Sequence, residues 1–142
     1  MTDPFGLARF VQAQEPVLPQ VRQELGDGYK RSHWMWFIFP QLRGLGHSEM
    51  ARRYAIASLA EAQAYLRHPD LGPRLLECTQ LVNAVEGRSI HQILGSPDDR
   101  KFHSSMTLFA AAQPGASVFQ EALGKYFGGA PDPMTSEKLL PR

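Results

Sequence analysis

The stretch LGPRLLECTQLVNAVEG, residues 71–87, carries the clearest hydrophobic pattern in the chain. Its apolar residues are spaced by four, three, four and three positions, which places them on one face of an α-helix; they are Leu71, Leu75, Cys78, Val82 and Val85. Gly87 follows the last of them, and glycine commonly ends a helix. We therefore predict an amphipathic helix here, with the side chain of Cys78 directed into the core.

Helix-capping residues precede most of the other apolar segments. Three serines each stand three positions before a glutamate or glutamine, a spacing that lets side chains accept hydrogen bonds from free N–H groups at a helix start: Ser58 with Glu61, Ser89 with Gln92, and Ser117 with Gln120. Three further starts combine a capping residue with proline at the first helical position: Asp3-Pro4, Ser96-Pro97 and Asp132-Pro133. The residues predicted to face inward are Leu75, Cys78, Val82, Phe102, Met106, Phe109, Phe119 and Leu123.

The run Trp34-Met35-Trp36-Phe37-Ile38-Phe39 has no helical or strand period of its own. No other segment alternates as a strand does, so a single strand here would lack a hydrogen-bonding partner. We interpret the run, called the aromatic block below, as a short buried helix ended by Pro40. The sequence therefore predicts an all-α fold, with residues 1–142 forming one domain of about seven to nine short helices.

Composition limits the class of protein. The chain has 142 residues, 43% of them hydrophobic and 20% charged, values typical of one globular domain. The single cysteine excludes an internal disulfide, and the histidine spacing matches no metal motif, so we expect no metal and no cofactor. The N-terminal residues lack the pattern of a signal peptide, and no apolar run is long enough to span a membrane. We expect a cytoplasmic protein.

Positive charge is concentrated in one part of the chain. Residues 29–57 contain five basic residues and one acid, although the whole chain has a formal net charge of only +1. A local positive patch on a nearly neutral protein favours a small anionic ligand over nucleic acid as the partner.

The segment KRSHWMWFIFPQL, residues 30–42, gives the chain a specific resemblance. Further matching segments are Asp3-Pro4-Phe5, Arg9-Phe10-Val11, Gly44-Leu45-Gly46, Arg53-Tyr54, residues 95–99 with Lys101, residues 104–109, and residues 126–129. On these segments the chain resembles a bacterial family of small proteins with a domain of unknown function, sometimes mislabelled calpastatin. His103 departs from the family pattern, in which arginine is common at this position. The resemblance implies an all-helical fold with a right-handed superhelical arrangement, and it implies no reaction.

The residues around the aromatic block suggest a ligand site. Tryptophan can stack on a flat ring, and arginine can hold a phosphate or carboxylate through two hydrogen bonds. If Ser32 began a helix, its free N–H groups would also attract an anion. The candidate ligand-binding residues are Lys30, Arg31, Ser32, His33, Trp34, Trp36, Arg53, Asp98, Asp99, Lys101 and Ser105. Residues 44–48 form a weaker candidate, because this glycine-flanked loop lacks a complete phosphate-binding motif.

Two functions of different class remain open. In the first, the protein binds, or binds and processes, a small anionic or nucleotide-like ligand in an aromatic and basic pocket. In this case Arg31 should lie close to Asp98 or Asp99, because the cations near residue 30 need compensating acids. In the second, the protein is a structural or interaction module. The aromatic block is then core, and the basic patch contacts an acidic partner.

Overall fold

A computed structural model describes residues 3–140, in which there are ten α-helices and no β-strand. The helices are α1 (Ala8–Gln14), α2 (Leu18–Gly26), α3 (Met35–Ile38), α4 (Glu49–Arg53), α5 (Leu59–Arg67), α6 (Leu71–Ala84), α7 (Ile90–Leu94), α8 (Asp98–Ala112), α9 (Val118–Phe127) and α10 (Pro133–Leu139). The predicted all-α class is confirmed, with one helix more than the upper end of the expected range. Met1 and Thr2, part of the segment considered for an export signal, lie outside the described residues.

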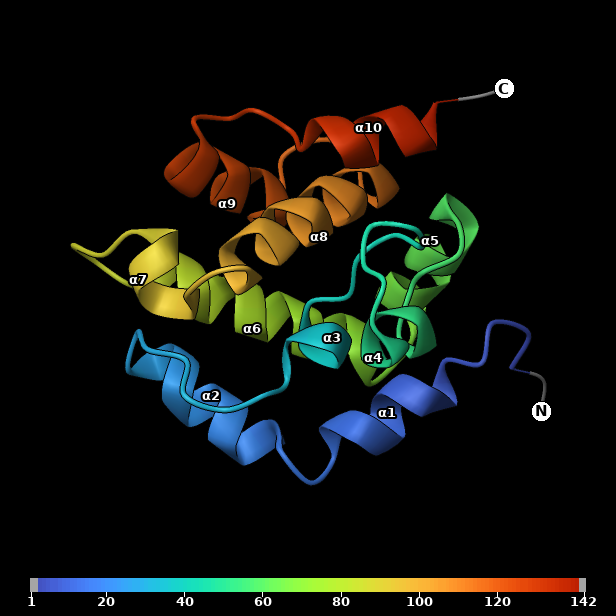
Figure 1. Cartoon of the computed structure of the whole chain (residues 1–142), viewed down its shortest axis with the longest axis horizontal. Coiled ribbons are helices and arrows are strands. Elements are labelled where there is room, and N and C mark those ends of the chain that lie inside the picture. Colours follow the sequence, from blue (N-terminus) through green and yellow to red (C-terminus); the bar gives the residue numbers. More distant parts are fainter. Residues whose placement is uncertain (1–2, 141–142) are drawn as a thin grey trace.

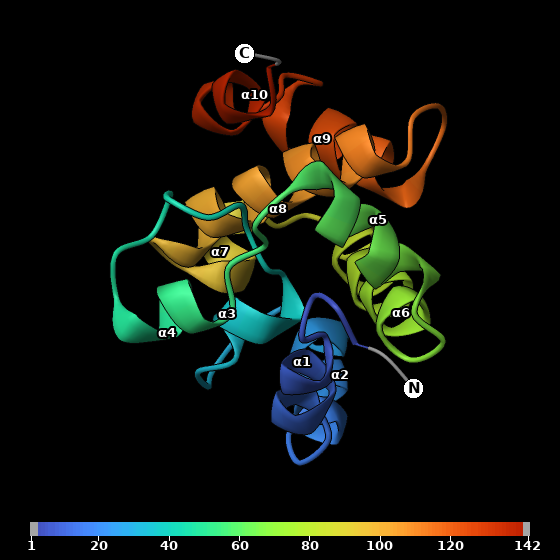
Figure 2. The same cartoon turned by 90° about the vertical axis from the view of Figure 1, so that its right-hand side faces the viewer.

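Helix α8 occupies the centre of the molecule (Figure 1). It packs against α5, α7, α9 and α10, while α6 packs against α2, α5 and α9. Figure 2 shows α9 and α10 on one side of α8 and α1 and α2 on the opposite side. Within residues 3–140, no helix is both long enough and apolar enough to cross a membrane.

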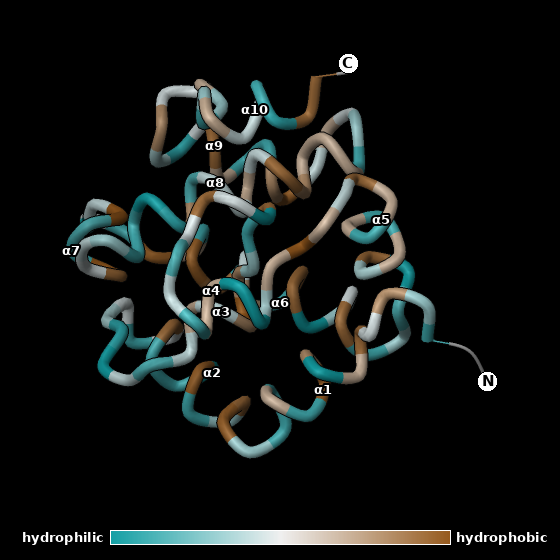
Figure 3. Tube along the Cα trace, turned by 45° about the vertical axis from the view of Figure 1, so that its right-hand side comes forward, coloured by the Kyte–Doolittle hydropathy of each residue, from teal (hydrophilic) through white to brown (hydrophobic). Residues whose placement is uncertain are grey.

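One hydrophobic core joins these helices. All eight residues predicted to face inward are buried, so the apolar stripe of α6 and its counterparts in α8 and α9 are confirmed. Aromatic rings meet edge to face across the core, as Phe39 does with Phe102 at a centroid distance of 5.0 Å. Hydrophobic and hydrophilic residues are mixed along the helices (Figure 3), as expected when each helix buries only one side.

Most of the predicted helix starts are confirmed. The side chains of Ser58, Ser89, Ser117 and Asp132 each accept a hydrogen bond from the main-chain N–H three residues later. The prediction for Ser96 is wrong, because α8 begins at Asp98 without a side-chain cap. At the N-terminus, Asp3 accepts hydrogen bonds from the N–H groups of Leu7 and Ala8. Helix α1 therefore begins at Ala8, later than the Asp3-Pro4 pair predicted.

The aromatic block forms α3 and turns directly into an extended segment. An isolated parallel bridge joins Leu42 to Ile56, and the N–H of Arg43 donates to the carbonyl of Ile56 at 2.8 Å. Residues 41–47, here called the glycine loop, include the bridged residue Leu42 and lead to α4. Gly46 is required for close packing, because a Cβ atom there would lie 2.6 Å from the Cβ of Ala51. The bridge and the packing on α4 hold the glycine loop beside the first turns of α8.

Candidate functional site

The segment before the aromatic block is organised by a buried carboxylate, Glu24, which is 1% exposed. Glu24 accepts hydrogen bonds from the N–H groups of Arg31 and Ser32 at 2.7 and 3.0 Å, and from the Ser32 hydroxyl at 2.6 Å. Burial by itself raises the pKa of Glu24, but the hydrogen bonds from Ser32, Arg31 and Trp34 outweigh it and lower the pKa to about 2. The condition that Ser32 begins a helix is not met, because α3 begins at Met35 and the N–H of Ser32 is bonded to Glu24.

The aromatic block is mainly core. Trp34 is 1% exposed and its indole N–H donates to Glu24 at 3.0 Å, so Trp34 is not available to stack on a ligand. Phe37 and Phe39 are buried as well. Trp36 is the exception, since it is only partly buried. The structure thus assigns Trp34 to the core and leaves Trp36 beside the surface.

The segments around residues 30 and 98 do meet, but through a different cation from the one expected. Lys30 Nζ lies 2.9 Å from Asp98 Oδ2, and its side chain is 8% exposed. Arg31 instead pairs with Asp27 at 2.8 Å, on an exposed surface. The cation that compensates Asp98 is therefore Lys30, whereas the guanidinium of Arg31 is engaged by Asp27, four residues away.

The remaining predicted residues separate into several environments. Asp99 accepts a hydrogen bond from the N–H of Arg100 and lies 3.2 Å from His91. His33 is exposed, outside the pockets described below. Arg53 is also exposed, with its guanidinium 5.7 Å from the centroid of the Tyr54 ring. Ser105 is fully buried, and its hydroxyl has no hydrogen-bond partner within residues 3–140. His33, Arg53 and Ser105 thus do not join Lys101 and Trp36.

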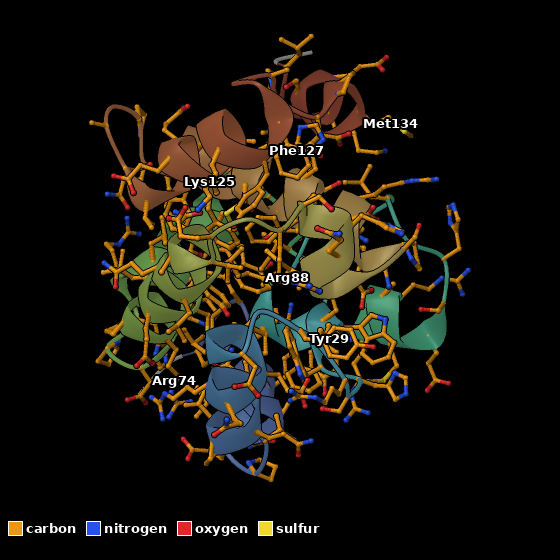
Figure 4. The ribbon with its side chains drawn as sticks, turned by 90° about the vertical axis from the view of Figure 1, so that its left-hand side faces the viewer. Tyr29, Arg74, Arg88, Lys125, Phe127 and Met134 are labelled. Carbon is orange, nitrogen blue, oxygen red and sulfur yellow. The ribbon has the colours of Figure 1, made fainter. Side chains whose placement is uncertain are left out.

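A pocket of about 510 Å³ lies between the glycine loop, the first half of α8 and the start of α10. It is lined by Gln41, Leu45, Gly46, Pro97, Arg100, Lys101, His103, Ser104, Asp132 and Met134. Three of these residues carry a basic side chain, and Asp132 is the only acid among them. The exposed side chain of Met134 marks the α10 side (Figure 4). We call this cavity the α8 pocket.

The single acid of the α8 pocket is occupied by local hydrogen bonds. Asp132 Oδ2 accepts from the N–H of Thr135 at 3.0 Å, the Thr135 hydroxyl at 2.6 Å and the Ser104 hydroxyl at 3.3 Å. These contacts cap α10 and join it to α8. Arg100 forms no ion pair within the described chain. The pocket therefore presents more positive than negative charge.

His103 is held in a defined orientation. Its ring stacks on Phe127 with centroids 3.9 Å apart and planes inclined by 4°. Nε2 lies 2.8 Å from the carbonyl oxygen of Ala130, so this nitrogen must carry the proton that it donates. The other ring nitrogen then accepts a hydrogen bond in the neutral ring and donates one when the ring is charged.

A narrow crevice adjoins the α8 pocket. It is lined by Met35, Trp36, Phe39, Gln41, Ala51, Tyr54 and Lys101. Gln41 and Lys101 border both cavities, and Lys101 Nζ lies 5.4 Å from the centroid of the Trp36 ring. Of the predicted site residues, Trp36 and Lys101 thus remain together, at the junction of an aromatic crevice and a cationic pocket.

Several residues of the α8 pocket were not predicted from the sequence. Arg100, His103 and Ser104 have the spacing i, i+3, i+4 of a single helix face. This spacing predicts that the three side chains lie together, so the sequence did contain evidence for them. Asp132 was recognised only as a helix cap. Nothing in the sequence indicates that the start of α10 packs beside α8, so the position of Asp132 in the pocket could not be predicted.

The fold and the pocket define a small all-helical protein with a cation-lined cavity at its central helix. The chain belongs to the family described as protein of unknown function (DUF1810), whose model matches residues 4–139. It is similar to the conserved hypothetical protein Rv1873 from Mycobacterium tuberculosis, of known crystal structure, with 60% identity and a TM-score of 0.95 over 96% of this chain and 98% of that chain. No curated protein matches the chain. The resemblance found in the sequence is confirmed.

Within the described residues, no group of three or more histidine, cysteine, aspartate and glutamate side chains is arranged to hold a metal ion. The arrangement at the α8 pocket instead offers hydrogen-bond donors: a guanidinium, an ammonium and the amide of Gln41. Such a set of donors suits an anionic group.

Proposed function

We propose that this protein binds a small anionic molecule in the α8 pocket. The observation that carries the proposal is the position of Arg100, Lys101 and His103 around a cavity whose one acid, Asp132, is already hydrogen bonded to Ser104 and Thr135. Cations that face a concave surface reinforce each other's potential and attract small anions. Lys101 is also paired with Asp98 at 3.6 Å. Arg100 has no ion pair in the described chain, so its positive charge is the least compensated in the pocket.

The neighbouring crevice is too small to hold a ring, with a free volume of about 10 Å³, but it brings a partly buried aromatic side chain, Trp36, to the edge of the α8 pocket. Trp36 is the one aromatic residue of the block left partly exposed, and Lys101 joins its crevice to the α8 pocket. A ligand with an anionic group at Arg100 and a flat ring near Trp36 would use both features, and nucleotides and related phosphorylated metabolites have this shape. The apolar lining from Leu45, Pro97 and Met134 suits the non-ionic part of such a molecule.

The test is a thermal-shift screen of nucleotides and phosphorylated metabolites on the full chain, followed by calorimetric titration of any compound that raises the Tm. A ligand at about 100 times its Kd should stabilise the protein by about 2.7 kcal/mol. Arg100→Gln should raise the Kd about tenfold or more. The matched control is Arg67→Gln on α5, an exposed cation with no ion pair in the described chain, which should leave the Kd unchanged. Equal effects of the two variants would contradict a site at Arg100.

A second candidate is the interaction module. The observation that favours it is the burial of Trp34, Phe37 and Phe39 together with exposed cations on the segment that follows, Arg43, Arg52 and Arg53. In this role no small molecule would raise the Tm. An acidic polypeptide such as polyglutamate would bind instead, and Arg53→Glu would weaken that binding by reversing one contact charge.

A further inference from the structure

A second concave site borders the glycine loop and adjoins the α8 pocket only at Gly46. Its cavity of about 360 Å³ is lined by Arg43, Gly44, Gly46, His47, Arg52 and Ala55. Three of the six residues, Arg43, His47 and Arg52, have a basic side chain, and none is an acid. We call it the loop hollow. Only Gly46 borders both cavities, so the two sites share no cation.

The basic side chains of the loop hollow lack ion-pair partners among the described residues. Arg43, His47 and Arg52 are exposed and form no ion pair with any residue between 3 and 140. A fourth cation lies close by, since a Cβ atom at Gly44 would be 2.9 Å from Lys138 Nζ. Like charges gathered around one cavity repel one another, and a bound anion would reduce that repulsion.

The backbone around the loop hollow is fixed rather than loose. Arg43 is held by its N–H bond of 2.8 Å to Ile56, and Ser48 caps α4 through a bond of 3.1 Å to the N–H of Ala51. Gly44 has φ +94°, a backbone conformation that other residues rarely adopt. Gly46 leaves room for the Cβ of Ala51, which a side chain at that position would meet. The cations thus extend from a preorganised frame, which lowers the entropic cost of ordering them around a ligand.

We propose that the loop hollow binds a phosphate group, either as free phosphate or as a phosphate monoester. Two guanidinium groups can each give paired hydrogen bonds to phosphate oxygens, and an N–H of the His47 imidazole can donate a third hydrogen bond. A long polyanion is disfavoured because Glu49, the first residue of α4, places a negative charge beside the site. This inference is independent of the proposed function, because neither Arg100 nor Lys101 takes part.

The experiment is a titration of the ¹⁵N-labelled full chain with inorganic phosphate, and separately with glycerol phosphate, at constant ionic strength. Saturable shifts are expected at the amides of Gly44, Gly46 and His47. Arg43→Gln and Arg52→Gln should each raise the Kd about fivefold or more. Arg53→Gln is the matched control, because Arg53 is the neighbouring cation on α4 but does not line the hollow; it should change the Kd less than about twofold.

Three outcomes would overturn the proposal. The first is no saturation by about 20 mM of either anion, a concentration at which even millimolar binding is nearly complete. The second is equal weakening by Arg52→Gln and Arg53→Gln, which would indicate general charge attraction. The third is shifts confined to residues 97–104, which would place the anion in the α8 pocket. Arg100→Gln separates the two proposals: it should weaken ligand binding in the α8 pocket about tenfold or more and leave the phosphate titration of the glycine loop unchanged.

Discussion

The indole N–H of Trp34 donates a hydrogen bond of 3.0 Å to Oε1 of Glu24, and both residues are 1% exposed. This contact ties the aromatic block to α2. The same carboxylate accepts from the main chain of Arg31 and Ser32, so one buried acid determines the path of the chain from α2 into α3. Its charge is stabilised by hydrogen-bond donors rather than by a cation, since neither Arg31 nor Lys30 forms an ion pair with it.

Glu24→Gln should destabilise the protein by about 2–4 kcal/mol at neutral pH, because an amide cannot accept from all the donors that face Glu24. The folded pKa of about 2 lies below the ordinary 4.5, so the stability that the charge provides is complete above pH 4.5. It is lost as the pH falls from 4.5 towards 2. Urea unfolding from pH 7 to pH 2 measures both effects.

Between pH 4.5 and pH 2, the free energy of unfolding of the variant should therefore fall less than that of the wild type. Glu77→Gln is the control, since Glu77 is an exposed acid paired with an exposed arginine; its cost should stay below about 1 kcal/mol. An unchanged fall in Glu24→Gln would show that other carboxylates control the acid unfolding.

Arg9 connects the N-terminal helix to the rest of the fold through all of its side-chain donors. It pairs with the buried Glu61 at 2.9 Å and donates to the carbonyls of Phe5, Gly6, Arg53 and Ala55. Arg9→Lys keeps the charge but loses the planar arrangement of donors, so it should cost about 2–4 kcal/mol in urea unfolding. Arg22→Lys at the exposed pair with Glu77 should cost less than about 0.5 kcal/mol. Similar costs for the two variants would contradict a special role for the Arg9 geometry.

The pair of Lys30 with Asp98 should be coupled more strongly than an exposed pair. The side chains of Lys30 and Asp98 are 8% and 18% exposed, so water screens them only in part. A double-mutant cycle with Lys30→Met and Asp98→Asn should give a coupling free energy of about 1–2 kcal/mol. The matched cycle on Arg31 and Asp27, whose side chains are 48% and 37% exposed, should give less than about 0.5 kcal/mol. Equal coupling in both cycles would be the contrary result.

Cys78 should be unreactive in the folded protein. It is 1% exposed, and burial raises the pKa of its thiol to about 12. Because the thiolate is the reactive form, modification by a thiol reagent at pH 8 should be at least about a hundredfold slower than in urea-unfolded protein. Absorbance of the released thiol chromophore measures both rates. Modification of native protein at the unfolded rate would mean that α6 exposes this face.

Ser105→Ala should leave the stability unchanged or raise it by about 0.5 kcal/mol. The hydroxyl of Ser105 is fully buried without a hydrogen-bond partner in the described chain, and removing an unsatisfied polar group relieves its desolvation cost. Ser104→Ala, which removes a bond to Asp132, should instead destabilise. Chemical denaturation of the two variants compares their stabilities. A clear loss of stability in Ser105→Ala would contradict the prediction and indicate that the hydroxyl has a partner, such as a buried water.

Features that depend on neighbouring residues could be predicted from the sequence. The caps at Ser58, Ser89 and Ser117 act within one helical turn, and the stripe of α6 reflects the helical period alone. Predictions were wrong where a more distant group competed. At Ser58, the capping partner Glu61 accepts from Ala57 and Arg9 rather than from the serine N–H. Ser32 gives its donors to Glu24, eight residues away.

The sequence by itself determined the class of fold, because helical periodicity and capping are local properties. The need to balance charge also predicted that the basic segment around residue 31 lies near Asp98 or Asp99. Only the tertiary structure decided which cation met Asp98, since formal charge does not distinguish Lys30 from Arg31 and only the packed backbone brings one ammonium to 2.9 Å. It also decided that Trp34 is core while Trp36 borders a crevice. The α8 pocket exists because three segments distant in the chain pack side by side, and which surfaces meet depends on the shape complementarity of the whole core.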